Sequence, residues 1–229
     1  MDNPALAQPT AILRLRKLFP PGTSIAWSES PRADDELLPA EIAATVGMAA
    51  ARRQAYAQGR WCAHRALAQL GLPDAAVLTG EQRAPLWPPG ITGSIAHCAG
   101  RAIAVAARLE VAGSVGVDME ETGDLEAGVL ELICTRAERE WLAHSGDATL
   151  ARSLFAIKES VYKCLWSRVR RFIDFQEVEI DMDISCHRYR ARATGAGLDT
   201  PTVAAIRGAY LQIGELLFAS AYLPPSSTP

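Results

Sequence analysis

The sequence lacks the short motifs that identify several large enzyme classes. It contains no GxSxG, HExxH, GxxxxGK[ST] or GxGxxG pattern. Each of these patterns places a nucleophile, a zinc ion or a phosphate group at a defined point of a fold. Hydrolase triads, zinc proteases, P-loop enzymes and Rossmann dehydrogenases therefore have no support.

Paired cysteines and long apolar stretches are also missing. The five cysteines stand singly, with no CxxC pair and no zinc-like Cys/His spacing, and their odd number excludes complete pairing within one chain. No stretch approaches the ~20 apolar residues of a membrane span, and the N-terminus has no apolar core of a signal peptide. We expect a cytoplasmic protein with reduced, mostly buried cysteines and no membrane association.

A surplus of basic residues is absent as well. The formal net charge is -3, and 49% of the residues are hydrophobic. This balance is ordinary for a globular protein and argues against a general nucleic-acid binder. The 229 residues suffice for one large domain or two small ones with a real core.

The predicted elements come in a similar order in the two halves of the chain. The first half is expected to form strands at 24–30, 93–98, 101–109 and 114–120. One helix is expected after Ser30 or Asp34, either of which could cap it, a second helix from Pro39, and a long helix over 49–70 with Gly71 as its stop. The second half is expected to form helices over 125–146 and 148–169 and strands over 177–184, 187–195 and 209–223.

The two long helices also share a short pattern. Tyr56-Ala57-x-x-Arg60 in the first aligns with Phe155-Ala156-x-x-Glu159 in the second. If this match reflects an internal duplication, the two halves face each other, and the cleft between them is a natural place for a ligand.

Acidic residues gather at the end of the strand in GVDMEE (116–121). Asp118 and Glu120 are two residues apart, so on a strand their side chains point to the same face. Neighbouring carboxylates repel each other unless a cation lies between them, and Mg²⁺ is bound by one or two carboxylates together with substrate phosphates. The alternative is a strand end that becomes acidic where it reaches water.

The stretch FAIKESVYK (155–163) places charges on an otherwise apolar helix. Phe155, Glu159 and Lys163 share one helix face, and Lys158 lies beside Glu159. A Glu–Lys pair at this spacing often only stabilises an exposed helix. Because the neighbouring residues are apolar, a buried site is the other interpretation, with a third carboxylate for the metal and a lysine for phosphate.

Basic residues upstream are candidates for binding phosphate. Arg52 and Arg60 share a helix face, and arginine is suited to phosphate, although a solvated face explains the same pattern. His97 stands among small residues that let a ligand approach the backbone.

Together these stretches resemble the 4′-phosphopantetheinyl transferases. GVDME and FAIKESVYK, about forty residues apart, look like the paired signature of that family. GSIAHC (93–98), RAPLWP (83–88) and the stretch from Arg52 to Arg60, which ends in Gly59-Arg60, resemble its larger Sfp type, in particular the branch of enterobactin synthetase component D.

The resemblance implies an α+β fold, a single-chain pseudo-dimer of two similar halves, 1–113 and 114–229. It implies a reaction in which the phosphopantetheine arm of coenzyme A moves to a serine of an acyl or peptidyl carrier protein, with release of adenosine 3′,5′-bisphosphate. Mg²⁺ is the implied cofactor, and a monomer is expected.

The resemblance also assigns roles to residues. Asp118, Glu120 and Glu159 would hold Mg²⁺, with Asp118 also close to coenzyme A. Glu159 would act as base, directly or through a water molecule. Lys158 would stabilise the pyrophosphate or the leaving group, and Lys163 would do so more peripherally or would hold Glu159 in place. The residues expected to bind the phosphates and the adenosine end of coenzyme A are Arg52, Arg60, Arg83, Ser94 and His97.

Two other functions remain as alternatives. One is a coenzyme A or nucleotide-binding module without catalytic activity, and the other is a metal-dependent nucleotide hydrolase. Arg168, Arg170 and Arg171 in SRVRRF form a further candidate feature, either a basic patch that attracts an acidic carrier or a solvated loop.

Overall fold

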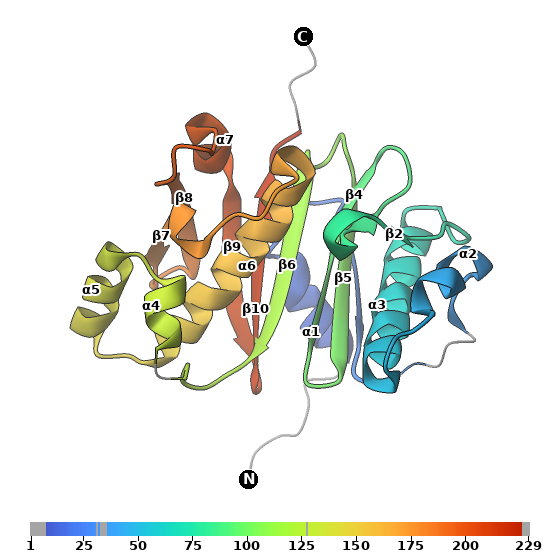
Figure 1. The fold of residues 1–229 in the computed structure, drawn as a ribbon, viewed down its shortest axis with the longest axis horizontal. Helices are drawn as coiled ribbons and strands as arrows, with labels where there is room; N and C mark the ends of the chain where they lie inside the picture. The colour runs from blue at the N-terminus through green and yellow to red at the C-terminus, as the bar shows by residue number, and fades with distance from the viewer. Residues whose placement is uncertain (1–7, 31, 33–35, 127, 226–229) are drawn as a thin grey trace.

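The computed structural model describes residues 8–30, 32, 36–126 and 128–225, which form two main β-sheets side by side (Figure 1). The first sheet has the strand order β1-β5-β4, the second has the order β6-β10-β9-β8-β7, and β2 pairs with β3 in a small third sheet. The strands are β1 (Ser24–Ser28), β2 (Leu78–Thr79), β3 (Pro85–Leu86), β4 (Ile91–Cys98), β5 (Arg101–Arg108), β6 (Ser114–Glu121), β7 (Val178–Asp183), β8 (Arg188–Ala193), β9 (Arg207–Ile213) and β10 (Leu216–Leu223).

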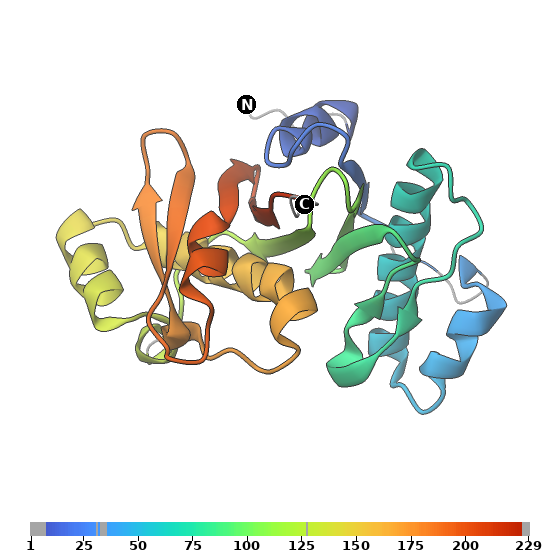
Figure 2. The ribbon, with the colours of Figure 1, turned by 90° about the horizontal axis from the view of Figure 1, so that it is seen from above.

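The helices cover both faces of these sheets. They are α1 (Gln8–Arg16), α2 (Pro39–Ile42), α3 (Ala50–Gln69), α4 (Val129–Ile133), α5 (Arg136–Ser145), α6 (Thr149–Val169) and α7 (Thr200–Ala205), with short 3₁₀ turns η2 (Ala43–Thr45), η3 (Glu81–Arg83) and η4 (Phe175–Glu177). The long helix α3 packs on the first sheet and the long helix α6 on the second, while α1 lies across the opposite face (Figure 2). No helix within the described residues is long and apolar enough to cross a membrane.

Strand β6 lies at the junction and shows why the two faces differ. Val115, Val117 and Met119 point into the core that α1 covers, which also holds residues of the first sheet. Because strand side chains alternate, Asp118 and Glu120 point the other way, toward α6. The fold thus places a pair of acids between the shared apolar core and helix α6.

Gly116 allows β6 to touch the backbone of α6. A Cβ atom at this position would lie 1.9 Å from the Ser160 carbonyl oxygen and 2.7 Å from the Cys164 amide nitrogen. Only glycine therefore fits this contact. The close approach brings the acids of β6 within reach of side chains on α6.

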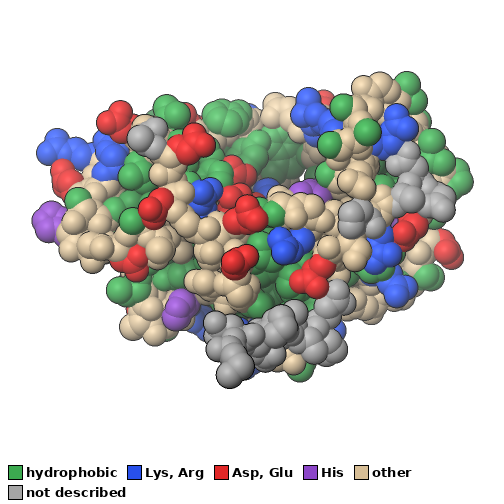
Figure 3. Space-filling view, turned by 90° about the horizontal axis from the view of Figure 1, so that it is seen from below, with side chains coloured by type: hydrophobic (Ala, Val, Ile, Leu, Met, Phe, Trp, Pro, Cys, Tyr) green, Lys and Arg blue, Asp and Glu red, His purple; other side chains and the backbone are tan. Residues whose placement is uncertain are grey.

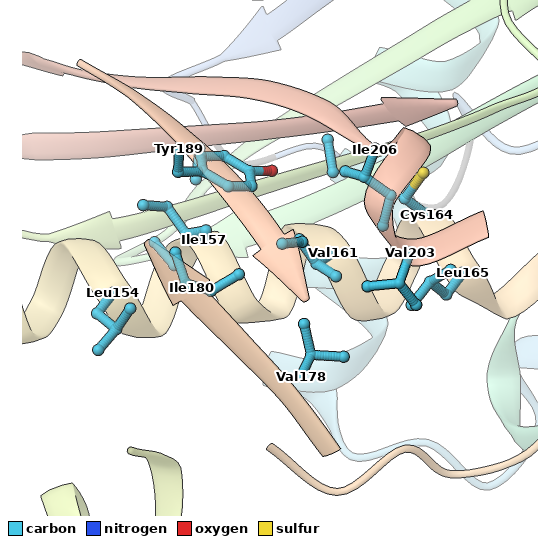
Figure 4. Close-up of a cluster of buried hydrophobic side chains, with 14 of the residues drawn as sticks. Leu154, Ile157, Val161, Cys164, Leu165, Val178, Ile180, Tyr189, Val203 and Ile206 are labelled. Atoms are coloured by element: carbon cyan, nitrogen blue, oxygen red, sulfur yellow. The ribbon is translucent and has the colours of Figure 1, made fainter. Parts of the chain in front are cut away.

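The opposite face of α6 is held by an apolar cluster (Figure 4). Leu154, Ile157, Val161 and Leu165 follow the three- and four-residue spacing of a buried helix face. Their partners come from β7, β8, α7 and the residue after it: Val178, Ile180, Tyr189, Val203 and Ile206. This packing fixes the rotation of α6, so that Glu159 and Lys163 are left on the side facing β6.

Most of the predicted elements are confirmed, and the α+β fold class is confirmed with them. The predicted single helix over 125–146 is wrong, because Thr135 begins a new helix after α4. Its side chain accepts a hydrogen bond from the Glu138 amide (3.3 Å), and the Glu138 carboxylate accepts one from the Thr135 amide (2.6 Å). Helices α1 and α7 were not predicted.

The helix predicted after Ser30 or Asp34 falls on a segment in which residues 31 and 33–35 lie outside the described residues. The second helix, predicted from Pro39, is confirmed as α2, and its N-cap is Leu38. We propose to divide the chain between Gly113 and Ser114, because the strands of the first sheet precede this point and those of the second follow it.

Replacing Gly116 by Ala tests the contact between β6 and α6. The added methyl group collides with backbone atoms, which cannot rotate away. We therefore expect the free energy of unfolding to fall by about 1–3 kcal/mol or more. Urea unfolding measures this loss. Gly197→Ala is the control, because its Cβ would meet only the end of the Arg171 side chain. Equal stability of both variants would show that β6 and α6 can separate without cost.

Candidate active site

Three carboxylates and a lysine meet where β6 faces α6. Lys163 donates hydrogen bonds to Asp118 Oδ1 (2.7 Å) and to the Val117 carbonyl oxygen (3.3 Å). Glu120 follows Asp118 on the same face of β6, and Glu159 precedes Lys163 by one helical turn. The structure thus places Asp118, Glu120, Glu159 and Lys163 near enough for their charges to interact, but the three carboxylates are not gathered as tightly as a metal site requires.

The carboxylates lie in an environment that disfavours their charge. Burial raises the pKa of Asp118 above its ordinary value, although Lys163 opposes the shift. Burial raises the pKa of Glu120 as well, and Asp118 raises it further. Glu159 is shifted upward by burial and by Asp118, against the effect of Lys163. An additional positive charge nearby would favour the charged form of all three carboxyl groups and lower their pKa values.

One carboxylate oxygen of Asp118 is available to such a charge. Asp118 Oδ2 is buried and has no hydrogen-bond partner among the described residues. A buried carboxylate oxygen of this kind is costly unless a cation or donor binds it. Within the described part of the chain, no three His, Cys, Asp or Glu side chains lie close enough together to bind one metal ion as they stand. The donor set, hard carboxylate oxygen, still fits Mg²⁺.

Lys158 does not join this cluster. Its ammonium group lies on the buried face of α6, 2.7 Å from Glu138 Oε2. It also donates to the carbonyl oxygens of Ile133 (3.0 Å), Phe175 (2.7 Å) and Val178 (2.9 Å). The expected place of Lys158 beside the pyrophosphate is therefore not what the structure shows: this lysine joins α6 to α4, α5 and β7.

On the side of the first sheet, His97 packs against α3. A Cβ on Gly59 would lie 2.4 Å from His97 Nε2, so glycine is required where the ring meets the helix. The protein groups that surround the ring, together with the charges of Lys163 and Arg60, lower the pKa of His97 to about 4, although the residue as a whole is exposed to solvent. His97 is therefore neutral at pH 7 and offers a hydrogen bond, not a charge.

Arg60 is buried beside His97, and only part of its guanidinium group has hydrogen-bond partners. Its guanidinium lies 4.3 Å from the centre of the Tyr56 ring and donates to Thr79 Oγ1 (3.2 Å). Arg60 Nε has no partner among the described residues. Arg52, two turns earlier on α3, is exposed.

Ser94 links the two sheets. Its hydroxyl oxygen accepts a hydrogen bond from the Val117 amide (3.1 Å), which holds β4 against β6 next to Asp118. Ser94 and the exposed Arg83 both line a cavity of about 690 Å³. The cavity runs from the segment 80–87 along β4 to Lys163 and Trp166 on α6.

The face of the molecule seen from below the view of Figure 1 is hollowed. Figure 3 shows acidic side chains gathered near the middle of that face, with basic side chains and a histidine among them, beside a hollow lined by hydrophobic side chains. An elongated ligand with an anionic part and an apolar part fits this combination of surfaces.

Comparison with known proteins gives the family. Residues 40–107 match the model of the 4′-phosphopantetheinyl transferase N-terminal domain, and residues 114–203 match that of the 4′-phosphopantetheinyl transferase superfamily. The chain is 39% identical to the 4′-phosphopantetheinyl transferase Svp of Streptomyces mobaraensis over 175 residues, which are 74% of this chain and 71% of that protein. The chain belongs to the 4′-phosphopantetheinyl transferase superfamily.

Other relatives agree with this assignment. The transferase is 35% identical to 4′-phosphopantetheinyl transferase PptT of Mycobacterium tuberculosis over 75% of this chain and 79% of that protein. It is 36% identical to enterobactin synthase component D of Escherichia coli K12 over 55% and 61% of the two chains. All the residues predicted for the site fall within the two matched segments.

Sequence reasoning missed three residues that shape the site of this transferase. Gly59 and Gly116 permit the contacts of α3 with His97 and of α6 with β6. Arg152 on α6 forms an ion pair with Glu120. The available signal for Arg152 was its spacing, two helical turns before Glu159 on the same face.

Lys158→Met separates a structural from a catalytic role for this lysine. The substitution leaves the Glu138 carboxylate buried without its counter-charge, so we expect a loss of about 3–5 kcal/mol in the free energy of unfolding. Turnover per folded molecule, measured at low temperature, should stay near that of the unmodified protein. Lys17→Met, at an exposed position, is the control. A fully folded but inactive Lys158→Met protein would show that this lysine takes part in the reaction.

Proposed function

We propose that this transferase moves the 4′-phosphopantetheine arm of coenzyme A to a serine of an acyl or peptidyl carrier protein and releases adenosine 3′,5′-bisphosphate. The observation that carries the proposal is the meeting of Asp118 and Glu120 with Glu159 and Lys163 beside a cavity of about 690 Å³. We further propose that it acts as a cytoplasmic monomer, because both sides of this cavity come from one chain.

The proposed cofactor is Mg²⁺, held by Asp118, Glu120 and Glu159. The support is the partnerless Asp118 Oδ2 and the upward pKa shifts of all three acids. When bound, the ion would neutralise charge on the pyrophosphate and on the leaving phosphate.

Glu159 is the proposed base for the carrier serine. It would accept the hydroxyl proton, directly or through a water molecule, as the serine oxygen attacks the phosphorus that bears the pantetheine arm. The bond from that phosphorus to the bridging oxygen then breaks, and the electron pair leaves with adenosine 3′,5′-bisphosphate. The raised pKa of Glu159 supports this role, because it brings the carboxylate closer to the pH at which proton transfer is efficient.

Lys163 is the proposed cation for the pyrophosphate. Lys163 lines the cavity, and its side chain is 26% exposed. Asp118 and Glu159 raise the pKa of Lys163 against the effect of burial, so that it stays protonated. Lys158 is left out of this set because its ammonium is occupied on the other face of α6.

The first half of the chain is proposed to hold coenzyme A. Arg60 and His97 lie beside each other on α3 and β4, and Arg83 and Ser94 line the cavity. Arg52 is exposed on the same helix as Arg60. Arginine forks and a neutral imidazole N–H are suitable donors to phosphate oxygens.

A transfer assay tests the proposed reaction. The protein is mixed with coenzyme A and Mg²⁺, once with an apo carrier protein and once with a carrier whose acceptor serine is replaced by alanine. We expect a mass gain of one phosphopantetheine arm on the first carrier alone. Release of adenosine 3′,5′-bisphosphate without a carrier would indicate a hydrolase, and binding without any product would indicate a module that only binds coenzyme A. Carriers from fatty-acid, polyketide, siderophore and peptide synthesis are compared side by side.

Glu159→Gln tests the proposed base. Glutamine keeps the size and one coordinating oxygen but cannot accept the proton at neutral pH. We expect turnover at saturating Mg²⁺ to remain about 10²- to 10⁴-fold below that of the unmodified protein. Glu140→Gln, an exposed position on α5, is the control. Full recovery of turnover at high Mg²⁺ would leave Glu159 as a metal ligand only.

A further inference from the structure

Arg152 makes three directed contacts beside the site. Its Nη1 lies 3.3 Å from Glu120 Oε2. Its Nη2 donates to the Asp124 carbonyl oxygen (2.8 Å) and its Nε to the Gly123 carbonyl oxygen (3.5 Å). The three contacts use the whole guanidinium fork, which a lysine cannot reproduce.

The segment that Arg152 contacts has few other attachments. β6 ends at Glu121, and the Thr122 amide makes the next backbone link, to the Glu215 carbonyl oxygen (2.8 Å). Gly123 then turns the chain away from the sheet with φ +133°. Arg152 is therefore a side chain that ties the start of the connection toward α4 back onto α6.

Charge explains why Glu120 needs a fixed partner. Two cations, Arg152 and Lys163, border the three acids Asp118, Glu120 and Glu159, so the group carries a formal charge of three negative and two positive, a net -1. Glu120 lies near the end of β6, where the negative charge of Asp118 disfavours its own charge. Arg152 holds one carboxylate oxygen, which leaves the other available to a ligand.

We infer that Arg152 is a positioning residue for phosphopantetheinyl transfer: it fixes the Glu120 carboxylate and the Gly123–Asp124 turn against α6, and so sets the affinity of the site for a divalent cation. The inference rests on the proposed function, because it assumes that Glu120 binds the cation. Arg152 touches neither the cation nor the substrate in this role.

A different role predicts the opposite result. If Arg152 only compensated the charge of Glu120, removing it would make the site more negative and a cation would bind more tightly. If it positions Glu120, removing it lets the carboxylate move, and the cation binds more weakly. Arg152→Lys separates the two effects, because it keeps the charge and removes the fork.

The test compares Arg152→Lys and Arg152→Gln with Arg136→Gln. Arg136 is the matched control, since it also pairs with a glutamate, Glu140, but its side chain is 88% exposed and lies on α5. Mn²⁺ serves as the probe for a hard oxygen site, and its binding to the full chain without coenzyme A or carrier is followed by electron paramagnetic resonance. Hydrogen exchange of the amides in 121–126 reports on the turn independently of any metal.

Positioning predicts that Arg152→Lys binds Mn²⁺ several-fold more weakly and exchanges faster over 121–126, while Arg136→Gln changes neither. At saturating Mg²⁺ the turnover of Arg152→Lys should recover, and only its half-saturating Mg²⁺ concentration should stay raised. Unchanged exchange in both Arg152 variants overturns the inference, as does tighter Mn²⁺ binding by Arg152→Gln with unchanged exchange.

The experiment also separates this inference from the proposed function. If the unmodified protein does not bind Mn²⁺, the metal assignment is wrong. Exchange over 121–126 then still decides whether Arg152 holds the turn. If Mn²⁺ binds normally to both Arg152 variants while transfer proceeds, the proposed function stands and the positioning role is rejected.

Discussion

The contact between the backbones of β6 and α6 at Gly116 determines the rest of the site. A helix normally stands off from a sheet by the length of its side chains, about 10 Å between layers. At Gly116 a single Cβ would already lie 1.9 Å from a carbonyl oxygen of α6. Asp118 and Glu120 can reach the charged face of α6 because the strand and the helix approach this closely.

Small residues serve the same purpose on the other side of the cavity. Gly59 admits the His97 ring to the surface of α3, and a Cβ on Gly93 would meet the Trp87 ring at 2.4 Å. Ser94 then holds β4 to β6 through its hydroxyl group. The two halves are thus joined by side chains and by the apolar core under α1, and the space between them is kept free for a ligand.

Much of the fold and part of the site follow from local sequence patterns. Alternation predicts β6 and correctly places Asp118 and Glu120 on one face of that strand. Helical spacing predicts α6 and correctly places Glu159 and Lys163 on one face of that helix. The same reasoning misjudged Lys158, because a position one residue from Glu159 is about 100° around the helix. Which side of the helix faces the core depends on partners such as Glu138 and Val178, which are distant in sequence. Spacing alone also could not show that Arg152 bonds with the turn after β6.

The position of β10 in the second sheet has a consequence for how the protein is made. β10 lies between β6 and β9, and Asp118 of β6 pairs with Ala219 of β10. On the ribosome, β6 emerges well before β10, its neighbour in the sheet, which is translated only after the whole of 122–215. During that interval the acidic strand has an open edge, which is a site for wrong pairing and for capture by chaperones. The candidate site therefore forms late, because the carboxylates of β6 gain their fixed position in the sheet only when β10, translated after 122–215, is inserted.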